Sequence, residues 1–135
     1  MSTTYSLQQY IDDLRLIGSE SEDEDEIFRR LGPLALRLVA DRSWLQPKYY
    51  ETDASQGFGV HLLPPEPDHS LAVFSVNWLP GRGTPPHDHG TWAVVAGIEG
   101  IERNIRYRRI DANDRPGYAE LEAKKEFDAD AGELI

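Results

Sequence analysis

The sequence predicts one mainly β domain, a barrel or sandwich of short strands, that follows a helical N-terminal segment. Two observations carry this prediction. Apolar residues recur at helical spacing up to about residue 45, and short alternating runs separated by Gly and Pro follow. The 135 residues suit a single domain. We therefore expect a helical segment over residues 1–45 that packs on a barrel spanning residues 46–135.

The composition excludes several classes of protein. Cysteine is absent, which removes disulfides, thiolate metal ligands and a cysteine nucleophile. The formal net charge of −10 repels phosphate backbones, so we expect no nucleic-acid partner. No apolar run approaches the roughly 20 residues that span a bilayer, and the N-terminus does not resemble a signal peptide. We expect a cytoplasmic protein with no membrane partner; the sequence does not indicate its oligomeric state.

The N-terminal segment predicts two helices. Ser6 begins a capping box, and the apolar stripe that follows it ends near Gly18. A second helix is expected from Ser21, with the acidic run of residues 22–26 in its first turn, where negative charge complements the helix dipole. Pro33 lies inside the second apolar stripe and should kink or divide this helix.

The remaining chain predicts short strands. Apolar and polar residues alternate in most of them, whereas one run is apolar on both faces, as in a buried strand. Ile105 and Tyr107 mark the inward face of one strand, and Trp78 and Trp92 are interpreted as core residues. The last three residues resemble the start of a further strand. The expected strands cover residues 58–63, 70–79, 91–98, 101–110 and 118–127.

Two of the four histidines form the motif His87-Asp88-His89. On an extended chain, residues two apart point to the same side, so both imidazoles would project together. Neutral imidazole is a good ligand for Fe, Zn, Cu or Ni, and the pair is therefore a candidate chelating site. The competing interpretation is that two surface histidines flank a turn.

The residues around this pair narrow the interpretation. Gly81 precedes His87 with five residues between them, and a hydrophobic run followed by Gly97 comes after. This pattern resembles the first motif of the cupin superfamily, which implies a double-stranded β-helix, or jelly-roll barrel, around a metal. The stretch after His89 lacks the Glu ligand that is common in cupins. Residues 86–92 are also similar to the thiol dioxygenase branch, of the cysteine dioxygenase and mercaptopropionate dioxygenase type.

The resemblance implies a specific chemistry. In that branch three histidines hold Fe(II), which oxidises a small thiol with O2 to a sulfinic acid, and His87 and His89 match two of the three ligands. The branch's substrate-binding Arg has no counterpart here, because the matching position lies near His61. Arg103 and Arg109 lie on the expected inward face of their strand, so they are candidates for holding a substrate carboxylate through a bidentate contact.

The third metal ligand has three possible sources, since no histidine follows His89. The first is a truncated barrel that lacks the strands carrying the ligand, which we favour because the chain stops in an apparently unfinished strand. The second is an imidazole from upstream, either His61 or His69. The third is a carboxylate, Glu102 or Glu120, that would complete a triad of two histidines and one carboxylate.

Three functions follow from these alternatives. We expect a cysteine dioxygenase-like oxidoreductase with an Fe(II) cofactor and with a small thiol and O2 as its partners. A second possibility keeps the site but uses Zn, Mn or Ni for hydrolysis or isomerisation, because metal affinities overlap. A third is a non-catalytic remnant that binds a small ligand or a partner protein.

Overall fold

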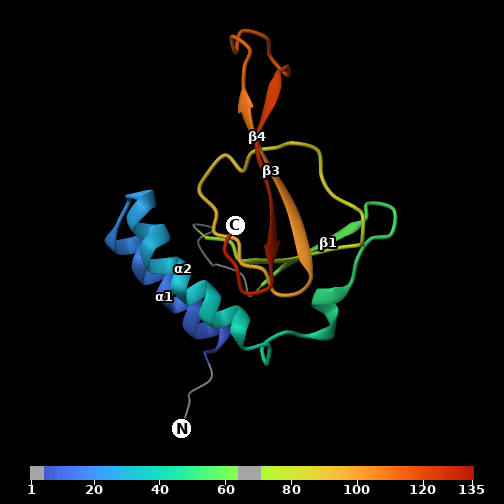
Figure 1. Cartoon of the computed structure of the whole chain (residues 1–135). Helices are drawn as coiled ribbons and strands as arrows, with labels where there is room; N and C mark the ends of the chain where they lie inside the picture. Colours follow the sequence, from blue (N-terminus) through green and yellow to red (C-terminus); the bar gives the residue numbers. More distant parts are fainter. Residues whose placement is uncertain (1–4, 64–70) are drawn as a thin grey trace.

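A computed structural model describes residues 5–63 and 71–135 of the chain. Figure 1 shows the two helices side by side along one flank of the β structure, and a long hairpin that projects from it. Within the described residues, none of the helices combines the length and apolar character needed to cross a bilayer. The elements in chain order are α1 (Leu7–Glu20), α2 (Glu24–Ala40), the 3-10 helix η1 (Pro47–Tyr50), β1 (Phe58–Leu62), β2 (Phe74–Trp78), β3 (Ile101–Arg109) and β4 (Leu121–Asp130).

Helix α1 begins where the sequence predicts it. The hydroxyl of Ser6 accepts a hydrogen bond from the backbone of Gln9 at 3.1 Å, and the side chain of Gln9 accepts one from the backbone of Ser6 at 2.8 Å. The predicted end at Gly18 is wrong, because the helix continues to Glu20 and the extended Ser21 follows it. Glycine lowers helix stability, but it ends a helix mainly where the backbone turns left-handed.

Helix α2 begins slightly later than predicted. Asp23 caps it by accepting a hydrogen bond from the backbone of Asp25 at 3.0 Å, whereas the hydroxyl of Ser21 donates to Glu26. The predicted acidic first turn is confirmed. Pro33 lies inside the helix without dividing it, because burial of the apolar stripe on both sides of Pro33 outweighs the hydrogen bond that proline cannot make.

The core lies between the helices and the segments that face them. Leu31 is the most deeply buried side chain of this cluster, at 1% exposure. Partly buried residues from outside the helices also pack against this cluster. Val73 comes from just before β2, and Trp92 and Val94 come from the segment between β2 and β3. The buried members are Tyr5, Tyr10, Leu14, Ile17, Ile27, Leu31, Ala35 and Leu38.

The strands form two separate antiparallel pairs. β1 pairs with β2 from Phe58 opposite Trp78 to Leu62 opposite Phe74. β3 pairs with β4 over their whole length, with one irregularity in the register after Arg106. The outer part of the β3–β4 pair forms the projecting hairpin in Figure 1.

The predicted double-stranded β-helix is therefore wrong. The sheets contain two strands each, and no closed barrel is found across residues 5–63 and 71–135. The expected strand at 91–98 makes only one isolated bridge, between Ala96 and Leu134. Its apolar side chains pack on the helical core instead, because apolar periodicity indicates burial and does not by itself specify a hydrogen-bonded ladder.

The expected inward face of β3 is also wrong. Ile101, Ile105 and Tyr107 are 71%, 41% and 40% exposed, whereas Glu102 and Asn104 on the opposite face are half-buried. An apolar alternation indicates which residues share a face of a strand. It does not show which face another part of the chain covers.

Candidate functional site

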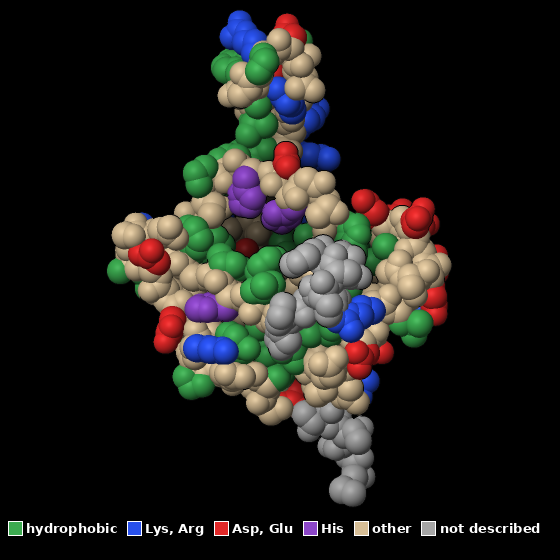
Figure 2. Space-filling view, turned by 180° about the vertical axis from the view of Figure 1, so that it is seen from behind, with side chains coloured by type: hydrophobic (Ala, Val, Ile, Leu, Met, Phe, Trp, Pro, Cys, Tyr) green, Lys and Arg blue, Asp and Glu red, His purple; other side chains and the backbone are tan. Residues whose placement is uncertain are grey.

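The two histidines of the motif lie close together on an exposed, irregular segment between β2 and β3. The ring centroids of His87 and His89 are 5.3 Å apart. Two imidazoles that bind one ion at about 2.1 Å from each nitrogen have centroids about 5 Å apart. Figure 2 shows two neighbouring histidine side chains beside a hollow, with hydrophobic side chains at its edge and an acidic side chain visible inside it.

Local sequence explains why this segment is irregular. Pro85 and Pro86 have no backbone N–H groups, so they cannot donate to a ladder. Gly90 has a φ of 67°, a left-handed conformation that ends the motif in a turn, and its N–H donates to the side chain of Asp88 at 3.0 Å. Asp88 is thus engaged in shaping the turn, next to the two imidazoles.

The hydrogen bonds of His87 determine which of its nitrogens is free. Nδ1 lies 2.9 Å from the carbonyl oxygen of Pro85 and 3.3 Å from the hydroxyl oxygen of Thr84. A carbonyl oxygen only accepts, so in the neutral imidazole Nδ1 carries the proton that it donates, and Nε2 has the free lone pair. Metal-binding histidines commonly donate the second ring nitrogen in this way, because the contact sets the tautomer and orients the ring.

The candidates for a third ligand are not gathered around this pair. Among the residues that the structure describes, no group of three His, Asp or Glu side chains could hold a metal. The Nε2 of His61 donates to the carbonyl oxygen of Glu51 at 2.8 Å, which is a structural contact. His69 lies outside the described residues. Glu120 accepts a hydrogen bond from Tyr118 at 2.6 Å on the exposed projecting hairpin.

Glu102 has a different environment from Glu120. It is half-buried, and desolvation raises the pKa of its carboxyl, while a hydrogen bond from the indole of Trp78 lowers it in part. Because Trp78 belongs to β2 and Glu102 to β3, this contact joins the two sheets. The sequence indicated Glu102 as a candidate carboxylate, but it assigned Trp78 to the core. No pattern in the sequence signals that these two side chains meet.

The β1–β2 pair has an apolar face on the side of β2 that carries Trp78. Val60 lies opposite Val76, and Leu62 lies opposite Phe74. Phe74, Val76 and Trp78 alternate along β2 and share one side of the strand. Trp78, on the same side of β2, donates a hydrogen bond to Glu102 of β3. The two facing pairs, Val60 with Val76 and Leu62 with Phe74, are 47–56% exposed. They form an open apolar surface, which we call the hairpin wall.

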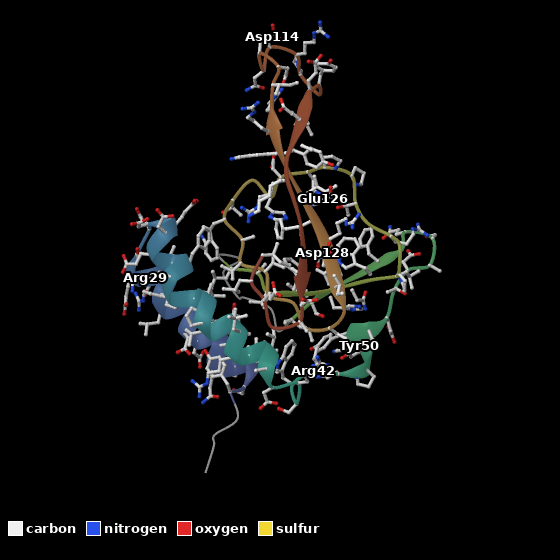
Figure 3. The ribbon with its side chains drawn as sticks, in the orientation of Figure 1. Arg29, Arg42, Tyr50, Asp114, Glu126 and Asp128 are labelled. Carbon is white, nitrogen blue, oxygen red and sulfur yellow. The ribbon has the colours of Figure 1, made fainter. Side chains whose placement is uncertain are left out.

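The two arginines predicted to hold a substrate carboxylate have acidic partners. Arg103 lies 3.3 Å from Glu126 and 3.4 Å from Asp128, which Figure 3 labels on β4 beside β3. Arg109 makes two hydrogen bonds with Asp111, at 2.6 and 3.0 Å. These contacts hold both guanidinium groups on their own hairpin, and a role in substrate binding stays a prediction.

The Arg109 contact predicts an unusually acidic carboxyl. The hydrogen bond from Arg109 lowers the pKa of Asp111 to about 2. This pair contributes stability above about pH 4, which is lost as the pH falls through 2, because protonation of Asp111 removes the charge. We expect the carboxyl carbon of Asp111 to titrate near pH 2 by NMR, and to titrate at higher pH in the variant Arg109→Ala.

A matched control lies one residue away on β3. Arg108 pairs with Glu122 at 3.1 Å rather than with Asp111, so Arg108→Ala should leave the Asp111 titration unchanged. An unchanged midpoint in Arg109→Ala would contradict the assignment of this pair.

No model of a known protein family matches the chain. The resemblance to thiol dioxygenases, which the sequence carries from about Trp44 to Arg109, therefore stays a prediction.

Proposed function

We propose that the chain binds Fe(II) through His87 and His89 and oxidises a small thiol to a sulfinic acid with O2. The observation that carries the proposal is the imidazole pair, with ring centroids 5.3 Å apart and Nε2 of His87 left free by the contact with Pro85. The resemblance of the motif to thiol dioxygenases favours iron over other metals. We place the reaction in the cytoplasm, where thiols remain reduced.

The reaction balances without a further reductant. A thiolate and one O2 give one sulfinate: the O–O bond breaks, two S–O bonds form, and the four electrons that sulfur loses reduce both oxygen atoms. Bound iron would supply open positions for the thiolate and for O2. His87 and His89 would hold the ion, the carbonyl of Pro85 orients the first imidazole, and the hairpin wall offers an apolar surface to the organic part of the thiol.

The test is anaerobic reconstitution of the full chain with Fe(II), followed by metal analysis and an oxygen-electrode assay. Cysteine and 3-mercaptopropionate are the first substrates. We expect about one iron per chain and one sulfinate for each O2 consumed, with the sulfinate identified by mass spectrometry. Thiol loss that yields only disulfide and hydrogen peroxide would overturn the proposal, and so would the absence of bound iron.

A second candidate function is metal binding without turnover. The observation that favours it is the lack of a third ligand beside the imidazole pair in the described part of the chain. A related alternative is that the imidazole pair binds another divalent metal and supports non-oxidative chemistry. Imidazole sites do not strongly select between Fe, Zn and Ni. Tight binding of Zn(II) or Ni(II), with no O2 consumption by the iron-loaded protein, would favour these alternatives.

A further inference from the structure

The outer part of the β3–β4 hairpin carries two cations directly opposite one another. Arg106 on β3 is the ladder partner of Lys125 on β4, so their side chains share one face of the sheet. Both lie over the ring of Phe127, with the guanidinium carbon 5.2 Å and the lysine Nζ 5.4 Å from the ring centroid. The ring attracts both cations but does not neutralise them. Because like charges directly opposite destabilise an antiparallel pair, an anion bound near both groups would stabilise the hairpin.

Two further cations join this pair at the irregularity in the ladder. The register shifts after Arg106, and Lys124 has no partner on β3. Such bulges redirect side chains and are common beside functional sites. Lys124 lines a shallow pocket of about 160 Å³ together with Arg108 and Glu122. Arg108 follows Arg106 by two residues on the same strand, so it shares that face. We call Arg106, Arg108, Lys124 and Lys125 the hairpin cations.

The hairpin cations are poorly neutralised by their own chain. In the described part of the chain, only Arg108 among them has a carboxylate oxygen within 4.0 Å of its charged nitrogens, that of Glu122 at 3.1 Å. Arg103 and Arg109 of the same strand, in contrast, both pair with acidic side chains. Four positive charges thus face one negative charge at this place, which leaves capacity for an anion.

The net charge of −10 does not keep anions from this part of the molecule. Arg106 lies five residues along β3 from Ile101, which corresponds to about 17 Å. Charges in water are screened over about 8 Å at physiological ionic strength, so the rest of the chain acts only weakly on the outer hairpin. Figure 2 shows Lys and Arg side chains on this projecting part.

The size and charge of the site indicate a small, multivalent oxyanion. Sites for drug-sized ligands enclose about 300–1,000 Å³, so a pocket of about 160 Å³ accepts only a small group. A guanidinium group binds phosphate through two parallel hydrogen bonds, and a lysine binds it as a point charge. A phosphate group carries more negative charge than a carboxylate, so it offsets more of the local positive charge.

We propose that the hairpin cations form a binding site for a phosphate group, either of an inorganic anion or of a small phosphorylated molecule. The bound phosphate offsets the repulsion between Arg106 and Lys125, so binding stabilises the outer part of the hairpin. The proposal is independent of the proposed function, because neither a metal nor a thiol takes part.

The test is a titration of the metal-free full chain with pyrophosphate, followed through the backbone amide signals in 1H–15N NMR spectra. We expect saturable shifts for residues 106–108 and 122–125, and much smaller shifts with sodium chloride at equal ionic strength. In Lys125→Gln, pyrophosphate should bind roughly fivefold more weakly, because one charged contact at an exposed site is lost. Saturable shifts with glycerol 3-phosphate would assign the site to organic phosphates, and shifts with the inorganic anions alone would assign it to free phosphate.

Two further variants keep the result interpretable. Lys48→Gln makes the same change of residue and charge on η1, which does not contact β3 or β4, so it should leave pyrophosphate binding unchanged. Lys125→Glu replaces the like-charge pair with Arg106 by an attractive one, so it should abolish binding while circular dichroism shows a folded chain. Equal binding of pyrophosphate to the wild type and to Lys125→Glu would overturn the proposal. So would shifts that sodium chloride reproduces, or an equal loss of binding in Lys48→Gln.

Discussion

Replacing His87 and His89 together with alanine is expected to abolish the binding of Fe(II) and any O2 consumption that depends on it. The two imidazoles are the only pair of histidine rings that pack together among the described residues, and Nε2 of His87 has no hydrogen-bonding partner there. Each histidine that binds a metal contributes directly to its affinity, so the loss of both removes the site. Equilibrium dialysis under argon, followed by metal analysis, measures the effect.

The matched control for this variant is His61→Ala. Its imidazole packs against Tyr49 at 6.1 Å between ring centroids and donates to Glu51, away from the His87 segment. We expect this variant to keep its iron while losing some stability. Equal iron content in the wild type and in the His87→Ala/His89→Ala variant would contradict the assignment of the site.

The second large effect is expected in the helical core. Leu31→Ala should lower the free energy of unfolding by about 2–5 kcal/mol, because it removes buried methyl groups and leaves a cavity between the helices. Leu31 is 1% exposed and belongs to the cluster that joins both helices. A loss of this size is a large share of the roughly 5–15 kcal/mol that stabilises a typical domain. Urea denaturation followed by circular dichroism measures it.

Leu16→Ala is the matched control, with the same substitution on the outer face of α1. Leu16 is 53% exposed, so its replacement should change the free energy of unfolding by no more than about 0.5 kcal/mol. Similar losses for the two variants would show that the helices do not share the tight core that the structure describes.

Elements held by local contacts were predictable from sequence. The capping box at Ser6 and the acidic first turn of α2 depend on residues within four positions of one another, and both are present. The locations of β1 and β3 were also close to prediction, because alternation and flanking turn residues are local signals. The end of α1 at Gly18 was missed, since glycine permits a helix stop without requiring one.

The arrangement of the strands was not predictable in the same way. Closure of a barrel depends on backbone pairing between distant segments, whereas the apolar run 91–98 shows only that its side chains are buried. In the structure Trp92 and Val94 are half-buried against the helical core, and the run meets the chain end in one isolated bridge between Ala96 and Leu134. The same reason explains the reversed burial of β3, where Glu102 and not Ile105 lies on the covered side.

The sequence by itself determined the two helices, the main hairpin strands and the His87-x-His89 pair, because each depends on spacing along a short stretch of chain. Only the tertiary structure decided that the strands form two separate sheets and that Trp78 meets Glu102 between them. Both depend on contacts between residues that are far apart in the sequence. Their formation depends on which surfaces pack together, and no local periodicity specifies that choice.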